Sequence, residues 1–423
     1  MKITAIISSG HGRLHFAQSA EWLARAGVAV KLVCGWVPRR ADSLLVKVCS
    51  RIVGRNLSAG MKKRAQALAG GGEVCQCALT DFIVSGMFLL ERRIMHGRLY
   101  GQIGAIGWRL FGLASRRWIK RFTNARDVVF HVRSGAGHGG AIRFAHKIGL
   151  PVVVDHSIAH PAYMEKHLRD EYLKNGEHFS LGTSSPFWRM VAEDCSWADM
   201  LLVNSFFVRD TFIEQGYPAE KIRVVYLGTR PDFFGIRAAR AHNRDQRKLK
   251  LLFTGNFSFR KGAEYLLEAI RILSERSKVP FEMDVVGSFD KAIVEAFDVK
   301  SLPIVFHGPV PQDELKGFLA RSDIYVFPSL AEGCACSGME AMAAGLCVVG
   351  THESGFPIED GVNGCIVPGK DAQAIVDKVL SLMDNPSEID RLGAAAAELI
   401  RTKYTWEQYA ENVKRIYEEL LSR

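Results

Sequence analysis

The sequence of 423 residues lacks any apolar run long enough to cross a bilayer. Its longest apolar stretches, residues 82–90 and 103–114, fall well short of the roughly 18 residues that a spanning helix needs, and the second contains Arg109. The apolar run after Lys2 is also too short for a signal peptide, because polar and glycine residues end it at 8–10. We therefore expect a cytoplasmic protein without a transmembrane helix.

Residue patterns that hold metal ions are also missing. The nine cysteines are scattered, and the close pairs Cys75/Cys77 and Cys334/Cys336 have one intervening residue where zinc sites usually have two or more. No Asp-x-Asp pair stands in a loop suited to a divalent cation. The sequence thus predicts reduced thiols and no structural metal.

Acidic residues are scarce in the first part of the chain. Residues 1–126 contain 21 Lys and Arg but 5 Asp and Glu, so the net charge of +10 comes entirely from this region. A nucleic-acid binder is one explanation, but it predicts basic and aromatic residues interleaved on a sheet or groove. Here the basic residues follow helical patterns, so we do not expect nucleic acid as a partner.

Short apolar, β-branched runs alternate with helical patterns in two series. The first series predicts parallel strands at 3–7, 28–34, 128–132, 152–155 and 200–203. The second predicts strands at 249–254, 283–286, 304–306, 324–327 and 347–349. Two such series predict the α/β class, with two doubly wound, Rossmann-like domains.

Composition divides the chain into four parts. We expect an N-terminal domain over 1–228, with a basic helical insertion at about 36–126, and a polar linker at 229–248. A second domain should span 249–402, and 403–423 should hold an amphipathic helix.

The sharpest motif is the segment 328–345, which follows one expected strand and precedes another. It places Glu332 in a loop and Glu340 in the next helix, at the sheet edge where α/β proteins bind ligands. Gly333 lets the backbone approach a ligand, and the helix that starts nearby directs its free N–H groups and its positive end into the same crevice. We expect this site to bind a diphosphate. Glu332 should accept hydrogen bonds from the hydroxyls of a transferred sugar, and Glu340 should accept them from the hydroxyls of a ribose.

A second motif, residues 255–262, follows the strand at 249–254 and opens a helix. Gly255 begins the turn, and Lys261 with Arg260 could meet phosphate oxygens. A solvated helix start is the alternative, but cations there oppose the helix dipole.

Together these motifs resemble the C-terminal domain of the retaining, GT-B fold glycosyltransferases of glycosyltransferase family 4. The resemblance covers the Gly-x5-Lys-Gly turn, the Glu332-x7-Glu340 spacing, the Glu-Ala-Met-Ala-x-Gly run, Thr351 with Gly355, and residues 360–364. It implies two facing domains, with the donor in the C-terminal half, the acceptor in the N-terminal half and the last helix crossing back. It also implies retention of configuration without a metal or other cofactor, the co-substrate being a UDP- or GDP-linked sugar.

The N-terminal half matches the family less tightly. Gly10 to Arg13 resembles the glycine-rich loop that faces the donor phosphates, and His156 stands where the family often has a histidine close to the reacting sugar. His131 and His160 are the competing histidines.

Three residues depart from the family pattern. Asn256 replaces the arginine that many members have after the first glycine of the phosphate turn, so Arg260 is the candidate replacement. Cys334 and Ala335 replace an aromatic residue and a glycine, which predicts an altered sugar pocket.

A nucleotide-sugar epimerase or a phosphorylase of the same fold is the alternative function.

The acceptor is expected at a membrane. In 103–122, a helical wheel groups apolar residues on one face and basic residues on another, which suits a helix lying on anionic lipid. The apolar face consists of Ile106, Leu110, Phe111, Ala114 and Trp118. The predicted basic surface consists of Arg109, Arg116, Arg117, Lys120 and Arg121. The protein would thus lie peripherally at the cytoplasmic face, acting on a glycan or glycolipid of the cell envelope. Alternatively, the apolar face packs on the domain's own sheet and the cations are merely solvated.

Overall fold

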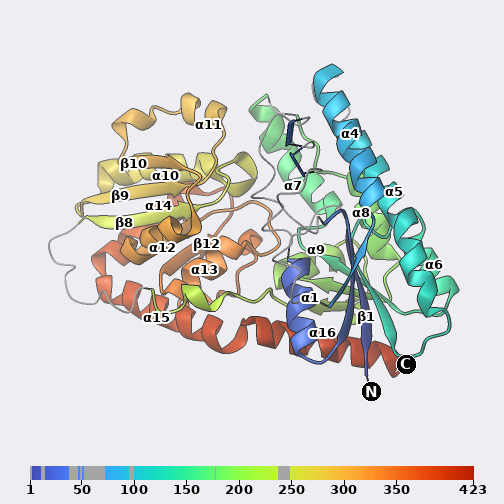
Figure 1. Cartoon of the computed structure of the whole chain (residues 1–423). Coiled ribbons are helices and arrows are strands. Elements are labelled where there is room, and N and C mark those ends of the chain that lie inside the picture. Colours follow the sequence, from blue (N-terminus) through green and yellow to red (C-terminus); the bar gives the residue numbers. More distant parts are fainter. Residues whose placement is uncertain are drawn as a thin grey trace.

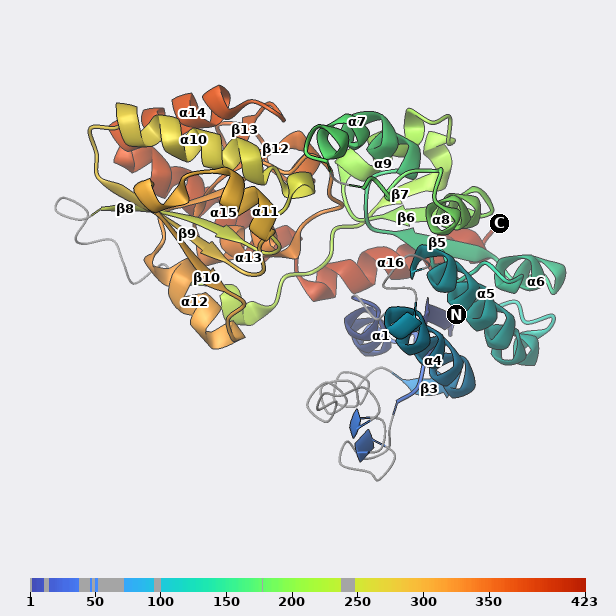
Figure 2. The same cartoon turned by 90° about the horizontal axis from the view of Figure 1, so that it is seen from above.

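The computed structural model contains two α/β domains side by side (Figures 1 and 2). It describes residues 2–10, 15–37, 46–47, 50–51, 72–94, 100–176, 178–236 and 248–423. Each domain is built on one parallel sheet, so the predicted α/β class with two Rossmann-like domains is confirmed. Parts of the predicted insertion and linker, and residues 11–13 of the predicted glycine-rich loop, lie outside the described residues.

The N-terminal sheet has, in the described ranges, seven strands in the order β3-β2-β1-β4-β5-β6-β7. These strands are β1 (Thr4–Gly10), β2 (Ala29–Cys34), β3 (Glu73–Gln76), β4 (Val128–Arg133), β5 (Val152–His156), β6 (Met200–Val203) and β7 (Ile222–Val224). The helices are α1 (Phe16–Arg25), α4 (Ala78–Ile94), α5 (Tyr100–Ile119), α6 (Ala141–Lys147), α7 (Pro161–Lys174), α8 (Pro186–Ser196) and α9 (Phe206–Ile213).

The central strands of this sheet are buried on both faces, which explains their continuous apolar runs. In β5, Val152 and Val154 belong to a core shared with α7 and α9, whereas Val153 belongs to a core shared with α1. Successive side chains of a strand point to opposite faces, so the polar residues that end β5 are also divided between the two faces.

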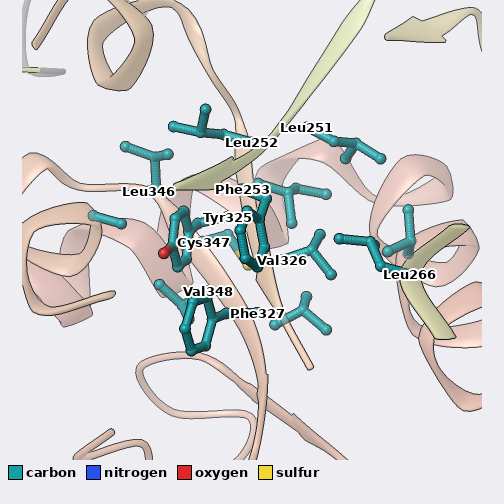
Figure 3. Packing of buried hydrophobic residues seen from close by; sticks show 14 of the residues in the cluster. Leu251, Leu252, Phe253, Leu266, Tyr325, Val326, Phe327, Leu346, Cys347 and Val348 are labelled. Atoms are coloured by element: carbon teal, nitrogen blue, oxygen red, sulfur yellow. The ribbon is translucent and has the colours of Figure 1, made fainter. Parts of the chain in front are cut away.

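The C-terminal sheet has six parallel strands in the order β10-β9-β8-β11-β12-β13. These are β8 (Leu249–Thr254), β9 (Phe281–Val286), β10 (Ile304–Gly308), β11 (Ile324–Phe327), β12 (Cys347–Thr351) and β13 (Cys365–Val367). The helices are α10 (Ala263–Arg276), α11 (Lys291–Ala296), α12 (Gln312–Arg321), α13 (Cys336–Ala344), α14 (Ala372–Asp384) and α15 (Pro386–Lys403). Figure 3 shows the central strands packing Phe253, Tyr325 and Phe327 in one cluster, where the rings of Phe253 and Phe327 stack at 5.3 Å.

The last helix, α16 (Trp406–Leu421), leaves the C-terminal domain and packs under the N-terminal sheet (Figure 1). Its buried face, which includes Tyr409, Val413 and Tyr417, joins the core that contains α1. Because the chain crosses between the domains at both the linker and this helix, two covalent connections set the geometry of the cleft.

Candidate active site

A cavity of about 770 Å³ lies between the two domains. The N-terminal domain lines it with residues of α1 and of the loops after β5 and β6, and the C-terminal domain lines it with α13 and the loops before it. The lining residues are His15, Ala17, Gln18, Ser157, Asn204, Leu227, Gly228, Thr229, Arg230, Lys261, Glu332, Cys334, Ala335, Cys336, Ser337, Met339, Glu340 and Trp406. The carboxyl ends of the strands in both sheets therefore face one shared space.

The N-terminus of α13 opens into this cavity. Ala335, Cys336 and Ser337 line the wall there, and no side chain caps the first turn of the helix. The first N–H groups of a helix lack partners within the helix and carry its positive partial charge. This wall can therefore accept the oxygens of a diphosphate, as the sequence predicts.

Two cations meet one carboxylate beside α13. Arg260 donates from Nη1 to Glu332 Oε1 at 2.5 Å and to the Ala331 carbonyl at 2.6 Å. Lys261 Nζ lies 3.4 Å from the same Glu332 oxygen and 4.9 Å from the centre of the Phe327 ring. Burial lowers the pKa of Lys261, and Glu332 opposes this shift. One carboxylate cannot neutralise two cations, so the cluster keeps an excess positive charge for an anionic ligand.

Glu340 lies in the same wall, and within the described ranges its carboxylate forms no close ion pair. Burial raises its pKa to about 7, and the charge of Arg230 limits the increase. Arg230 itself pairs with Asp232 at 2.6 Å. A buried carboxylate without a partner is costly, so this position suits a group that receives hydrogen bonds from ligand hydroxyls.

Glycines allow the two domains to approach each other at the cavity. A Cβ on Gly333 would lie 2.1 Å from the Ser157 carbonyl oxygen and 2.7 Å from Asn204 Nδ2, both in the other domain. Ser205 donates from Oγ to the Gly333 carbonyl at 2.6 Å. Gly333 is therefore a point of contact between domains as well as part of the loop that carries Glu332.

The structure brings together most of the residues predicted from the C-terminal motifs. Lys261, Glu332, Cys334, Ala335 and Glu340 all line the cavity, whereas Arg260 and Gly333 adjoin it through their contacts.

Three predicted donor-binding residues do not line the cavity. Gly255, at φ 124°, leaves room for Lys261, because a Cβ there would lie 3.3 Å from Lys261 Nζ. Asn256 is exposed and accepts a hydrogen bond from Ser288 Oγ at 2.9 Å. Gly10 lies under the Trp108 ring, which a Cβ would meet at 2.0 Å. Their roles in donor binding stay predictions.

The predicted catalytic histidine, His156, is buried at the end of β5 and does not line the cavity, although Ser157 does. Its Nδ1 lies 2.9 Å from Ser134 Oγ, and burial lowers its pKa to about 4. Of its competitors, His160 caps α7 by accepting from the Ala162 N–H, and its pKa is also lowered to about 4 by burial. His131 is fully buried.

Among the polar cavity residues that sequence reasoning missed are His15, Asn204 and Arg230. His15 follows the glycine-rich loop that was predicted to face the donor, and this proximity was the available signal. Asn204 Oδ1 is buried without a hydrogen-bond partner in the described part of the chain, so it can receive one from a ligand. Arg230 is the first charged residue of the linker, and nothing in its local sequence marks it.

The predicted interfacial helix, α5, is partly internal. Phe111, expected on its membrane face, is fully buried, whereas Ile106 of the same face is 43% exposed. The helix packs on α4, α6, α8 and β1. The alternative of packing on the domain's own sheet therefore holds for the Phe111 side of the helix.

The predicted basic residues lie along this helix and just after it. Arg116 packs over the Phe144 ring, Arg121 packs over Trp118, and Arg117 donates to the Gln76 carbonyl. Lys120 is exposed, and Arg109 lines a separate, shallow pocket beside His138. In the described residues, no helix is long and apolar enough to cross a membrane.

Comparisons with known proteins agree with this geometry. A family model described as "Glycosyltransferase Family 4" matches residues 89–233, and one described as "Glycosyl transferases group 1" matches residues 248–385. The amylovoran biosynthesis glycosyltransferase AmsK of Erwinia amylovora is 31% identical over 235 residues, which cover 52% of this chain and 56% of that protein. The putative colanic acid biosynthesis glycosyltransferase WcaL of Salmonella typhimurium is 29% identical over 194 residues, which cover 43% and 47%. The matches thus span about half the length of these curated relatives.

A solved structure shares the whole architecture. HepE of Anabaena, crystallised with UDP and glucose, superposes with a TM-score of 0.58 at 15% identity, covering 99% of this chain and all of that one. At this identity the likeness shows the fold alone. The two family models and the two facing parallel sheets together show that this chain belongs to the GT-B glycosyltransferases of the family 4 type.

Proposed function

We propose that this chain is a retaining glycosyltransferase that moves a hexose-type sugar from a UDP- or GDP-linked donor to a glycan or glycolipid of the cell envelope. One observation carries the proposal. The cluster of Arg260, Lys261 and Glu332 stands beside the uncapped N-terminus of α13, in a cavity that both domains line. The names of AmsK and WcaL, which refer to amylovoran and colanic acid, support an envelope polysaccharide as the product class.

Different residues of the C-terminal wall bind different parts of the donor. The α13 N-terminus, Lys261 and Arg260 hold the diphosphate, and Glu332 accepts hydroxyls of the sugar while Glu340 accepts those of the ribose. During transfer the bond from the sugar's anomeric carbon to the diphosphate oxygen breaks, and a bond to the acceptor oxygen forms. The leaving nucleoside diphosphate gains one negative charge, which the two cations stabilise until the diphosphate takes up the proton that the acceptor hydroxyl loses.

The test begins with a thermal-shift screen of UDP, GDP and their common sugar conjugates. A ligand that binds only the native state raises its melting temperature, so the matching nucleotide should shift it in a concentration-dependent way. Transfer to an envelope glycan extract is then followed with the labelled donor, and it should proceed undiminished in EDTA. Conversion of the donor to an epimer or a sugar phosphate, without transfer, would establish the alternative function. No shift with any conjugate would refute the donor site.

We propose further that the N-terminal domain docks on an anionic membrane through α4 and α5. Apolar side chains on one side of α4, spaced as a helical face, are exposed. They are Leu79 (73%), Ile83 (45%), Leu90 (61%) and Ile94 (62%). Exposed cations of the adjoining α5 region, such as Lys120, suit anionic headgroups at about 1 kcal/mol each. This surface replaces the α5 face that contains Phe111.

Vesicle flotation tests this docking. Wild-type protein should float with anionic vesicles at low salt and less at high salt, and Leu90→Asp with Ile94→Asp should abolish flotation. The charge reversals Arg116→Glu, Arg117→Glu, Lys120→Glu and Arg121→Glu should weaken it. Val362→Asp is the matched control, because Val362 is 45% exposed but lies in the C-terminal domain. Wild-type protein that stays in solution with anionic vesicles would contradict the proposal and favour a soluble acceptor.

A further inference from the structure

An imidazole stands in the N-terminal wall of the cavity. His15 directly precedes α1 and lines the same space as Lys261, Glu332 and the start of α13. Only 7% of His15 is exposed, so its position is fixed by packing. Its ring stacks on Phe16 at 4.7 Å. The cavity therefore has a buried, well-held titratable group on the side opposite the cations.

A carboxylate holds this imidazole. His15 Nε2 lies 2.9 Å from Asp155 Oδ2, and Asp155, at the end of β5, is 5% exposed. A carboxylate that is hydrogen-bonded to one ring nitrogen fixes the tautomer and the orientation of the ring. Because Nε2 is hydrogen-bonded to Asp155, Nδ1 is the ring nitrogen that we assign to the ligand.

A second histidine and a tyrosine lie behind the Asp155 carboxylate. His131 Nε2 lies 3.5 Å from the same Asp155 oxygen, and His131 Nδ1 lies 2.5 Å from the hydroxyl of Tyr417 on α16. Burial alone would raise the pKa of Asp155, but His15 and His131 outweigh it and hold the pKa well below its usual range. Asp155 is thus ionised, and the helix that arrives from the C-terminal domain completes its support.

The alternation of β5 separates this network from His156. Asp155 points to the face that carries α1 and α16, whereas His156 points to the other face, where it meets the Phe212 ring of α9 at 5.1 Å. His156 has no contact with the cavity, and its lowered pKa of about 4 keeps it neutral. Of these two imidazoles, His15 is the one placed to meet a substrate.

We propose that His15 contacts the sugar that is transferred, and that Asp155, supported by His131 and Tyr417, is the positioning residue that holds its ring. This inference rests on the proposed function, because it assigns a contact within that same site. A structural role for His15, in which it only anchors α1 through Asp155, is the competing explanation. The two explanations differ in what a glutamine at position 15 would restore.

The first experiment measures nucleoside diphosphate release from UDP-glucose, UDP-galactose, UDP-N-acetylglucosamine and GDP-mannose by the whole chain. With the donor that wild-type protein uses, His15→Ala should lower kcat at least about tenfold, while the donor KM and the Kd of the free nucleotide change less than about twofold. His15→Gln keeps a donor for Asp155, so it should restore the melting temperature without restoring kcat. Restoration of kcat by His15→Gln would show a structural role.

The second experiment tests the support. Asp155→Asn should lower kcat, and its effect should vanish when His15 is already Ala, because Asp155 acts through that ring. Tyr417→Phe removes only a hydroxyl and should cause a smaller loss of kcat in the same direction, even if Asp155→Asn fails to fold. His146→Ala is the matched control, since His146 pairs with Asp199 at 3.1 Å on the surface of the same domain. It should leave kcat unchanged.

The outcomes separate the inference from the function. Wild-type turnover with an unchanged kcat in His15→Ala overturns the inference and leaves the glycosyltransferase in place. Additive losses in the double variant overturn the positioning role of Asp155. Absence of turnover and of nucleotide binding in the wild type overturns the proposed function, and the inference with it.

Discussion

Glu340 is half-buried in the cavity wall, and burial raises its pKa to about 7. If its carboxylate accepts hydrogen bonds from the ribose hydroxyls, the sugar donor binds only the ionised form of Glu340. Donor binding then competes with protonation of this carboxylate. With a pKa of about 7, the ionised fraction rises from about 9% at pH 6 to about 91% at pH 8. We therefore expect the donor to bind about tenfold more tightly at pH 8 than at pH 6, a difference of about 1.4 kcal/mol.

Calorimetric titration with a nucleotide sugar measures this dependence. A nucleotide sugar is preferred to the free nucleoside diphosphate, because a terminal phosphate itself titrates near pH 6. Glu340→Gln cannot ionise and is the matched control, so its affinity should be independent of pH and should equal or fall below that of the wild type at pH 8. The same tenfold rise in Glu340→Gln, or a flat profile in the wild type, would refute the assignment of Glu340 to the ribose.

Three further predictions concern the other site residues. Glu332→Gln should remain folded and bind nucleotide at least as tightly as the wild type, because the two cations lose their counter-charge. Its transfer rate should fall by roughly tenfold or more, because the sugar loses a charge-assisted hydrogen bond worth roughly 1.5–3 kcal/mol. Near-normal transfer would contradict the role of this motif. Lys261→Ala should weaken nucleoside diphosphate and donor alike but leave the bare nucleoside unaffected, and equal loss for all three would indicate misfolding. The same measurements on Arg260→Ala show whether this residue replaces the cation absent at Asn256. His156→Ala tests the sequence prediction for this imidazole, which requires kcat to fall more than donor affinity; unchanged turnover would exclude it.

The sheets were largely predictable from sequence because their central strands are buried on both faces. All ten runs expected to form strands do so, as with the unbroken valines of β5. The sequence analysis missed β3. This edge strand has four residues, is partly exposed and shows neither an apolar run nor a clear alternation of apolar and polar residues. β7 and β13 have three residues each and give no periodic signal.

The site was predictable where its residues are close in sequence. Lys261, Glu332 and Glu340 lie in two short segments at adjacent strand ends, and local spacing places them together. His15 and Asp155 are 140 residues apart, so their contact depends on which strands adjoin and which helix covers them. The amphipathic pattern of α5 was likewise visible, but a pattern does not tell whether protein or lipid covers the apolar side.

The cavity exists because the two domains are closed on each other, and the contacts that close them include polar ones beside apolar packing such as that of Ala331. Glu171 of α7 inserts its carboxylate into the other domain, where Lys370 Nζ lies 2.8 Å from Oε1 and the Tyr265 hydroxyl donates to Oε2 at 2.9 Å. Lys370 adopts φ 62°, a backbone conformation that is unfavourable for non-glycine residues, so local backbone strain accompanies this contact. Polar contacts of this kind exchange for water at small net cost when domains separate. Where such polar contacts carry part of the closure, a substrate that hydrogen-bonds to both Lys261 and His15 would favour the closed arrangement by binding it more tightly than a separated one.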